Sequence, residues 1–516
     1  MNSRILRNRK VRLGKNKAES QVALPASIDE LISFIKAQFG ESNDIVYRDL
    51  ILGVSTIRAV VVYIGTLAKT DIINTQIMES VFRMDHVDNP AAEEDLMDFY
   101  ALRLLPVGNI SKIGSEQELI EVLLGGDTIF FMDGYSTAIA ISTEGSKQRA
   151  ILEPEVEHEV RGPRESFVEN IYTNMAMIRR IINNQNLRFL SFKLGDMTNT
   201  EVTVTYLYGH ADPEIVAEIK KRLDRIQLDG MLESLYVEEW IEDHPNSVFA
   251  QIDHTERPDR VAAMLLEGRV AIMVNGSPWV LIVPTLFVQF FTSSGDYYTH
   301  YYFATFIRWI RFVAFVFAMI VPAFYIALIT MHQEMIPTPL ALRIAGDRSG
   351  VPFPAIVEAL IMELAFEILR EAGIRLPKVA GQAVSIVGAL VIGEAAVQAG
   401  IVSPVMVIVV AVTGISSFAI PQFSLGMTTR ILRFPLMILA SIAGIPGITI
   451  ALLVILTYMA SLKSFGVPYL SPVAPFVRKD VHDTFFRAPW KKLSKGKHLF
   501  GRENKVEQGS EFETEE

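Results

Sequence analysis

The sequence predicts an α/β soluble N-terminal region of two related modules, followed by an all-α multi-spanning membrane domain. Three observations indicate this architecture. Charged residues are frequent up to about Phe291, whereas long uncharged apolar stretches follow Phe312. Two stretches of the N-terminal region resemble each other at an offset of about 142 residues. Glu394 is the only charged residue from Val379 to Thr429, a stretch long enough for two bilayer crossings.

Composition divides the 516 residues into five parts. We expect a basic disordered arm at 1–28, a first α/β module at 29–150, a second at 151–290, a membrane domain at 303–465 and a basic then acidic cytoplasmic tail at 466–516. The first 18 residues carry seven positive charges, and no apolar core follows them. A secretory signal peptide is therefore excluded. The arm is either solvated or attracted to anionic lipid.

The repeat predicts the same elements in both modules. Leu-Leu-Gly-Gly-Asp at 123–127 matches Leu-Leu-Glu-Gly-Arg at 265–269. Each is followed by an apolar strand, a tight turn and a second strand. Asp-Gly at 133–134 and Asn-Gly at 275–276 are typical of type I′ hairpins. Upstream, each module has a strand that ends in glycine, after which Asp71 or Asp212 is expected to cap a helix.

The segment that joins the two modules is dense in charge near a helix expected to begin at about Glu165. Its four charged residues are Arg161, Arg164, Glu165 and Glu169. They form either an interdomain or intersubunit ion-pair hub or an ordinary capped, solvated helix, and an anion site is the weakest alternative.

No motif indicates an enzyme. The chain has no phosphate-binding Gly-Lys-Ser/Thr loop, no His-Glu-x-x-His pair and no Gly-x-Ser-x-Gly elbow. It has no cysteine, which excludes disulfides and thiolate chemistry, and its nine histidines lack ligand spacing. We therefore expect no catalytic residue, no cofactor, no metal site and no nucleic-acid partner.

About four membrane spans are expected. They are Phe312–Thr330, Gly381–Gly400, Pro404–Ile420 and Pro435–Ala460. The last is expected to kink at Ile445-Pro446-Gly447. Both ends are expected on the cytoplasmic side, because the segment after Arg478 is basic and no export signal precedes the soluble region. Arg430 and Arg433 do not fit this orientation, since they would lie outside.

The segment Pro354–Ile374 is predicted to be an amphipathic helix rather than a span, because charges interrupt its apolar residues. It carries Glu358, Glu363 and Glu367. This acidic helix has three interpretations: a solvated face, a contact to a partner subunit, or a vestibule that concentrates cations.

Four segments carry a resemblance to a known family. They are Arg161–Asn170, Pro352–Glu367, Arg375–Lys378 and Gly381–Gly400. Together they resemble the A subunits of spore germinant receptors, and the resemblance runs from about Asp29 to about Arg487. A sister family, associated with the dipicolinate-release apparatus, shares these motifs.

The resemblance implies a multi-pass protein of the spore inner membrane that triggers germination. Its implied partners are a B subunit thought to bind the nutrient, a lipoprotein C subunit, and further copies of itself in a nutrient-gated channel for monovalent cations. A non-conducting scaffold or signal transducer is the main alternative, and a secondary transporter would require inverted repeats that the spans lack.

The helix Gly381–Gly400 is the best candidate for a pore lining. One stripe of its helical wheel contains Val384, Val387, Val391, Glu394 and Gln398. Acidic rings select cations, and apolar constrictions gate by dewetting. Alternatively, Glu394 is a structural carboxylate that is protonated or paired with Arg308, Arg375 or Lys378.

Overall fold

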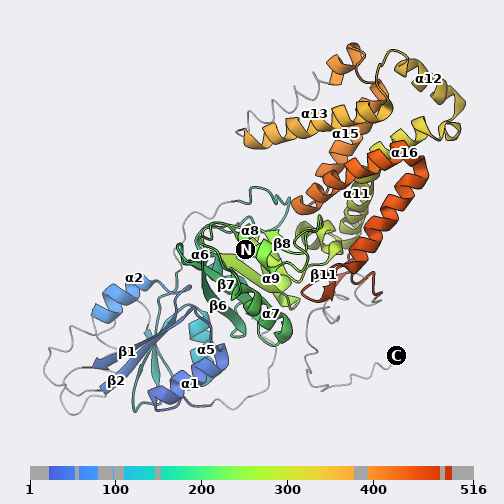
Figure 1. Ribbon diagram of the computed structural model, residues 1–516. Helices are drawn as coiled ribbons and strands as arrows, with labels where there is room; N and C mark the ends of the chain where they lie inside the picture. Colours follow the sequence, from blue (N-terminus) through green and yellow to red (C-terminus); the bar gives the residue numbers. More distant parts are fainter. Residues whose placement is uncertain are drawn as a thin grey trace, which may run out of the picture. The chain divides into compact units, whose positions relative to one another are not determined.

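The computed structural model describes residues 22–52, 57–79, 97, 110–145, 153–376, 393–476 and 483–490. The chain forms two compact units. One unit comprises residues 1–150 and 175–190, and the other comprises 151–174 and 191–516. Each unit is described by itself below (Figure 1).

The first unit contains a five-stranded antiparallel sheet in the order β1-β2-β4-β5-β3. Its elements are α1 (Ile28–Phe39), β1 (Ile45–Leu52), β2 (Ile57–Ile64), α2 (Thr70–Ile72), η1 (Ile73–Met78), β3 (Ile110–Ile113), α5 (Glu116–Leu124), β4 (Thr128–Met132) and β5 (Ala138–Ile141). Both sheet faces are buried. Val60 and Val62 face α1 and α5, whereas Val61 and Tyr63 face η1, as expected for a strand whose side chains alternate.

The second sheet repeats this strand order as β6-β7-β9-β10-β8. Its elements are α6 (Ile171–Ile181), β6 (Leu187–Leu194), β7 (Thr200–Leu207), α7 (Pro213–Leu223), α8 (Ser234–Ile241), β8 (Asp253–Thr255), α9 (Pro258–Leu266), β9 (Val270–Val274) and β10 (Val280–Val283). The register also repeats: Ala59 pairs with Met132 in the first sheet, and Val202 pairs with Val274 in the second. The predicted repeat is therefore present in the fold.

The repeated turns use one set of hydrogen bonds in both modules. The Asp133 carboxylate accepts the backbone N–H of Ile28 at 3.1 Å, and the Asn275 side-chain oxygen accepts that of Ile171 at 3.3 Å. Each turn thus caps the first helix of its own module. The hairpins are confirmed, but the type I′ turn is wrong. Only the second central residue, Gly134 or Gly276, has a positive φ, which is typical of a type II turn.

Three boundaries differ from those expected. Residues 22–28 belong to the first module rather than to an arm, because the backbone N–H of Leu24 donates to Gly114 and α1 begins at Ile28. The helix expected at about Glu165 begins at Ile171. Asp212 caps α7 as predicted, whereas Asp71 lies inside α2.

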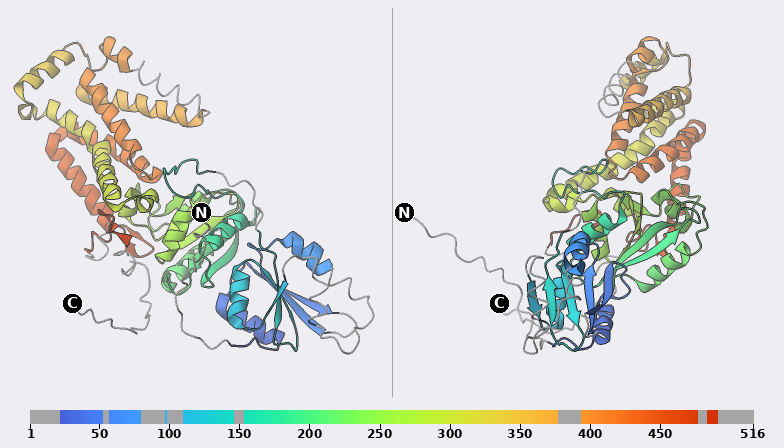
Figure 2. Two further views of the ribbon diagram at one scale, coloured as in Figure 1. Left: turned by 180° about the vertical axis from the view of Figure 1, so that it is seen from behind. Right: turned by 90° about the vertical axis from the view of Figure 1, so that its left-hand side faces the viewer.

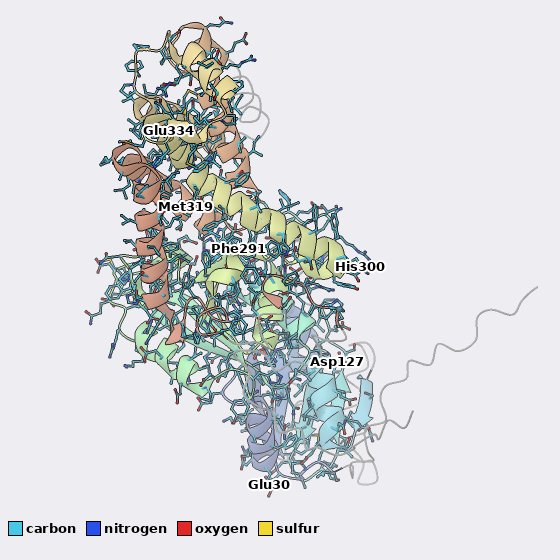
Figure 3. All side chains as sticks on the ribbon, turned by 90° about the vertical axis from the view of Figure 1, so that its right-hand side faces the viewer. Glu30, Asp127, Phe291, His300, Met319 and Glu334 are labelled. Atoms are coloured by element: carbon cyan, nitrogen blue, oxygen red, sulfur yellow. The ribbon has the colours of Figure 1, made fainter. Side chains whose placement is uncertain are left out.

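The helical region of the second unit follows a short connection built from η3 (Phe287–Phe291) and α10 (Gly295–Tyr298). Its helices are α11 (Tyr301–Thr330), α12 (Thr338–Arg348), α13 (Ala355–Arg375), α15 (Pro404–Phe418) and α16 (Phe423–Ser461). Figure 3 follows α11 from His300 past Met319 toward Glu334, and Figure 2 gives two further views of the helices. A two-stranded ribbon, β11 (Lys463–Ser464) and β12 (Val467–Pro468), closes the region.

Helix α16 consists of two arms that meet at Gly444, whose φ of 65° and ψ of −142° are not helical. Thr428 Oγ1 donates to the carbonyl of Val248, and Tyr458 packs against Phe249, at 6.3 Å between ring centroids. A straight helix would separate residues 30 positions apart by about 45 Å. The chain therefore runs out along the first arm and returns along the second, and the predicted kink is confirmed.

Two described helices, α11 and α16, are long and apolar enough to cross a membrane. Helix α15 covers 15 residues, about 22 Å, which is shorter than a hydrocarbon core of about 30 Å. Most of the predicted span Gly381–Gly400 lies outside the described residues. Of the four predicted spans, Pro435–Ala460 is corrected, because the chain reverses inside it at Gly444. The number of spans remains a prediction.

Candidate functional site

The predicted pore segment is described only from Gly393 onward. Three residues of the predicted stripe lie outside the described part of the chain: Val384, Val387 and Val391. Glu394 and Gln398 are both exposed, and Gln398 Nε2 donates to Glu394 Oε1 at 3.1 Å. A Cβ at Gly393 would lie 3.5 Å from Val407 of α15. The segment therefore packs closely on α15 while its carboxylate faces outward.

The basic residues considered as partners of Glu394 are placed elsewhere. Arg308 pairs with Asp296 at 3.1 Å and with Asp483 at 3.1 Å. Arg375 pairs with Glu371 one turn earlier on α13, and Lys378 lies outside the described residues. Arg308 and Arg375 thus pair with other carboxylates and not with Glu394.

Glu358, near the start of α13, is fully buried. Its carboxylate pairs with Arg348 of α12 at 2.9 Å and accepts the backbone N–H of Ser403 at 3.0 Å. Since Ser403 is the N-cap of α15, this carboxylate connects three helices. Its anionic charge is also favourable at the N-terminus of α15.

Glu363, farther along α13, is also fully buried and pairs with Arg433 of the first arm of α16. The Arg433 guanidinium additionally donates to the carbonyl of Ala318 in α11 at 2.8 Å. The pair thus holds α13, α16 and α11 together. The solvated-face interpretation is wrong for Glu358 and Glu363, because arginines that are distant in sequence neutralise them. Arg433 lies inside the helical bundle. It therefore no longer counts as a basic residue on the outer side of the membrane.

Glu367, the third carboxylate of α13, is partly exposed. It lies 3.5 Å from Arg370 and 3.8 Å from Arg430. Arg370 also donates to Ser417 of α15 at 3.1 Å. All three predicted carboxylates of α13 therefore make ion pairs. For the two that are fully buried, removing the partner typically costs about 3–5 kcal/mol.

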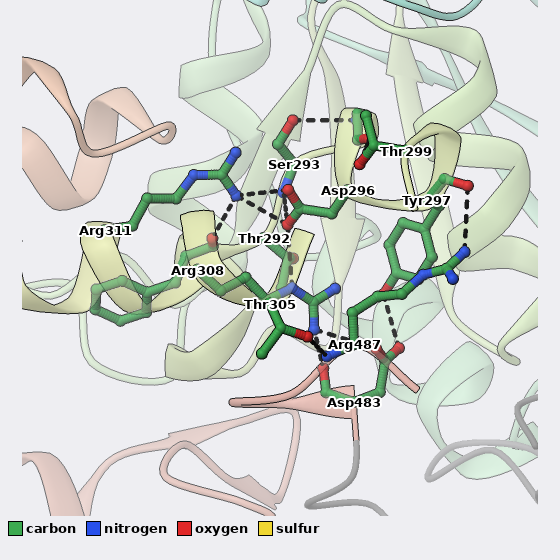
Figure 4. Close-up of polar contacts among 12 residues, drawn as sticks. Thr292, Ser293, Asp296, Tyr297, Thr299, Thr305, Arg308, Arg311, Asp483 and Arg487 are labelled. Carbon is green, nitrogen blue, oxygen red and sulfur yellow. Dashed lines mark hydrogen bonds and ion pairs between the residues drawn. The ribbon is translucent and has the colours of Figure 1, made fainter. Parts of the chain in front are cut away.

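A second charge cluster fixes the base of α11 (Figure 4). Asp296 of α10 is buried and accepts from Arg308 at 3.1 Å and from Arg311 at 2.8 Å. Arg308 also donates to the backbone carbonyl of Asp483 at 2.6 Å, and Tyr297 donates to the Asp483 carboxylate at 2.8 Å. Burial and Asp483 raise the pKa of Tyr297 well above its usual range. The residues after the helical region therefore pack against its first helix.

A third charge cluster ties the segment 153–166 to the start of α9. The Glu256 carboxylate accepts the backbone N–H groups of three successive residues at 3.1, 2.7 and 2.9 Å: Glu155, Val156 and Glu157. The backbone N–H of Phe167 donates to the carbonyl of Glu256 at 2.8 Å. This part of the linker is thus a fixed element of the second module.

Arg260 of α9 is at the centre of this third cluster. It pairs with Glu157 at 2.8 Å and with Asp253 of β8 at 2.6 Å. Burial raises the pKa of Glu157, although Arg260 opposes that shift. The Gln422 amide lies against both Glu157 and Arg260. Gln422 is the N-cap of α16, so the network connects the second module to the turn between α15 and α16.

Three of the four predicted charged linker residues lie outside this cluster. Arg161 and Glu169 are exposed, and Arg164 makes an exposed pair with Glu153 at 3.3 Å. Glu165 is half-buried. The ion-pair cluster is built instead from Glu157 of the linker and Arg260 of α9.

A fourth polar group lies between α8 and β8. Burial raises the pKa of Glu238 to about 8, and the pKa of Glu242 to about 7. His254 Nδ1 lies 3.9 Å from the Glu238 carboxylate, and burial lowers the His254 pKa. Among the described residues, no group of three His, Asp or Glu side chains could hold a metal ion.

Comparison with known proteins shows the family of this chain. Residues 33–499 match the model of the Bacillus/Clostridium GerA spore germination protein. The chain belongs to this family. It is 44% identical over 494 residues to spore germination protein KA of Bacillus subtilis, covering 96% of this chain and 90% of that protein. It is 39% identical to spore germination protein GerLA of Bacillus cereus, covering 90% of this chain and 94% of that protein.

A crystal structure also matches part of this member of the GerA family. It is the N-terminal domain of the A subunit of the Bacillus megaterium spore germinant receptor GerK3. That domain is 35% identical to this chain, with a TM-score of 0.42, and the match covers 52% of this chain and 99% of the domain.

Sequence reasoning missed Asp296, Asp483, Arg260 and Gln422, which connect the helices of this GerA-family chain to its second module. Their partners are far away in the sequence: Arg308 and Asp483 are 175 residues apart, and Glu157 and Gln422 are 265 apart. The one available signal was the pair Arg308 and Arg311 directly before an uncharged stretch, since arginines at the base of an apolar helix need acceptors.

Proposed function

We propose that this chain is the A subunit of a nutrient-responsive germinant receptor in the spore inner membrane, and that its oligomer conducts monovalent cations. It works with a B subunit and a lipoprotein C subunit. The homologous spore germination proteins support the receptor assignment. The conducting role rests on Glu394, a carboxylate within an otherwise uncharged apolar stretch.

The environment of Glu394 supports a path for cations. The α13 carboxylates Glu358 and Glu363 are neutralised by arginines of other helices, whereas Glu394 is exposed and its described contact is the amide of Gln398. A charge at mid-bilayer costs about 2.5–3.5 kcal/mol on insertion scales unless it faces water or a partner. In a symmetric oligomer, Glu394 and Gln398 would form polar rings beside rings of Val384, Val387 and Val391, as a gated cation path requires.

The attachment of the helices supports an even number of membrane passes. Arg308 near the start of α11 pairs with Asp296, and Ser464 after α16 donates to the carbonyl of Gln251 at 2.8 Å. Entry and exit of the helical region therefore meet the same soluble module. Both termini then lie on one side, which the basic segment after Arg478 assigns to the cytoplasmic face.

The experiment is a flux measurement on the purified full chain in liposomes, with its receptor partners present. Glu394→Gln keeps the hydrogen bond with Gln398 but removes the charge, and we expect a severalfold lower cation efflux at unchanged oligomer mass. Glu334→Gln is the matched control, because Glu334 is an exposed carboxylate in the short 3-10 helix η4 (Gln333–Met335) after α11. An efflux unchanged by Glu394→Gln would contradict conduction and leave a scaffold that passes a signal between subunits.

Germination assays on spores can distinguish a receptor A subunit from the sister homologue. A receptor A subunit is required for the response to a nutrient, whereas the sister homologue amplifies ion release that other receptors begin. Deletion of the gene is expected to abolish the response to a particular nutrient. A uniformly slower response to every nutrient would assign the chain to the sister role.

A further inference from the structure

A short loop of the second module, residues 158–164, is closed at its base by a buried arginine. Arg257 donates to the carbonyl of Glu157 at 3.1 Å and to the carbonyl of Pro163 at 3.0 Å. Arg257 is 2% exposed and is itself held by Asp259 at 2.9 Å. One guanidinium thus joins the two ends of the loop, which fixes its shape.

The middle of this loop is fixed as well. Gly162 has a φ of +139°, and a Cβ at this position would lie 2.6 Å from the ring of Tyr298. Only glycine fits there, because the space is closed and the backbone conformation disfavours other residues. The Tyr298 hydroxyl donates to Asp259 at 2.6 Å, so the ring against the loop is also held.

This rigid loop displays an apolar side chain followed by two cations. Val160 is 102% exposed, and Arg161 and Arg164 are also exposed. A preorganised loop loses little conformational entropy when it binds. The loop 158–164, which is held by buried charges and exposes an apolar and cationic tip, is therefore suited to docking.

Helix α8 presents the complementary surface. Its outward side carries Leu235, Tyr236 and Trp240, which are 49%, 39% and 47% exposed, together with exposed Glu239. Its glutamate Glu238 faces inward instead. Such clustered exposed aromatic and aliphatic side chains are typical of protein interfaces, where aromatic residues dominate the binding energy.

The loop and α8 lie on opposite sides of the second sheet. In β8, Asp253 pairs with Arg260 of α9, whereas the next residue, His254, faces Glu238 of α8. Successive residues of a strand point to opposite faces, so α8 and the N-terminal turn of α9, which holds the loop, are on different faces. One module can therefore contact a copy on each side.

We propose that the second modules of neighbouring copies associate head to tail, with the loop 158–164 of one copy on the α8 face of the next. Val160 packs against Leu235 and Trp240, and the arginines face Glu239. Such a heterologous contact uses two different patches and closes into a ring when the rotation permits. This inference rests on the proposed oligomer and names the contact that builds it.

Engineered cysteines test the contact, because the chain contains no cysteine of its own. In the full chain in membranes, the double variant Val160→Cys, Leu235→Cys is expected to form a ladder of disulfide-linked oligomers under mild oxidation. Each single variant alone is expected to stay uncrosslinked, and a mixture of the two is expected to give only dimers. Val160→Cys with Leu266→Cys is the control, since Leu266 is equally exposed but lies on α9.

The outcomes separate this contact from the proposed function. Self-crosslinking of Val160→Cys alone indicates a two-fold contact and overturns the head-to-tail arrangement. An intact oligomer by mass without any crosslink overturns the interface but leaves the channel proposal standing. A monomer in membranes overturns both.

A charge reversal gives a second readout that does not depend on oxidation. Arg161→Glu is expected to weaken oligomer association about tenfold or more, and Glu239→Arg in the same chain is expected to restore it. Arg58→Glu on the first module, also an exposed arginine, is the matched control. Equal weakening by both single arginine variants would contradict the contact.

Discussion

Helix α5 of the first module begins after Ser115, its N-cap, and carries exposed Glu118 one turn later. The equivalent helix α9 of the second module has Arg257 and Arg260 at these positions, and both are buried in ion pairs. Sheet order, register and turn capping are shared by the two modules. At these two positions the modules differ in buried charge, which α9 carries and α5 does not.

The hydrogen bonds that the two modules share stabilise each module itself, whereas the ion pairs of α9 connect the second module to other segments. The shared turns cap the first helix of each module through Asp133 and Asn275. Their other backbone contacts stay within the same module, since Asp133 N–H donates to Arg58 and Asn275 N–H to Glu201. The added arginines bind the linker through Glu157 and the turn before α16 through Gln422. The second module is therefore the part through which a change in the soluble region can reach the helices.

The largest expected effect comes from breaking the added network. Arg260→Leu leaves Glu157 and Asp253 buried without their countercharge, and we expect a loss of about 3–5 kcal/mol in unfolding free energy. Glu118→Leu at the equivalent exposed position of the first module removes one exposed hydrogen bond, from the Gly114 N–H, and is expected to cost about 1 kcal/mol or less. Thermal unfolding of the detergent-solubilised chain measures both. Equal losses would remove the distinction between the modules.

A pH dependence is expected from α8 of the second module, whose Glu238 is buried. The folded state holds the Glu238 proton more tightly than the unfolded chain, with a pKa of about 8. Folding is therefore favoured at low pH, and this stabilisation is lost as the pH rises through about 8. Between pH 6 and 8, the unfolding free energy is expected to fall by about 2 kcal/mol. Glu238→Gln should make this decline smaller but not abolish it, because Glu242, with a pKa raised to about 7, loses its own stabilisation in the same range. Glu239→Gln, on the exposed side of α8, should retain the full decline.

The shared turns are expected to contribute equally. Asp133→Ala and Asn275→Ala each remove a side-chain cap from the first helix of a module, which costs about 1 kcal/mol. Chemical denaturation of the two variants measures this loss. A large effect in only one module would show that the common hydrogen bonds do not have a common structural role.

The smallest expected effect is at the exposed linker pair. Arg164→Ala removes the contact with Glu153, whose side chain is 64% exposed. Exposed ion pairs contribute at most about 1 kcal/mol, so we expect almost no change in thermal unfolding. A loss as large as that of Arg260→Leu would move the centre of the linker network to Arg164.

The sequence predicted the repeat well, because hairpin turns and strand patterns are local. The Asp-Gly and Asn-Gly turns marked both hairpins, and Asp212 marked the start of α7. The pairing of the charges was not predictable in this way. Glu363 looked solvated in its own helix, but its partner Arg433 follows 70 residues later. The reversal of α16 at Gly444 is likewise defined by contacts of Thr428 and Tyr458 with one distant loop.

The central claim is that Glu394 lines a water-filled path for cations. Glu394→Cys introduces the only thiol of the chain, so its accessibility to a membrane-impermeant, positively charged methanethiosulfonate reagent can be measured directly in liposomes. We predict rapid modification in the presence of the nutrient and a block of cation efflux once the thiol is modified. A thiol that stays unmodified in the nutrient-exposed oligomer, or modification that leaves efflux unchanged, would contradict the claim.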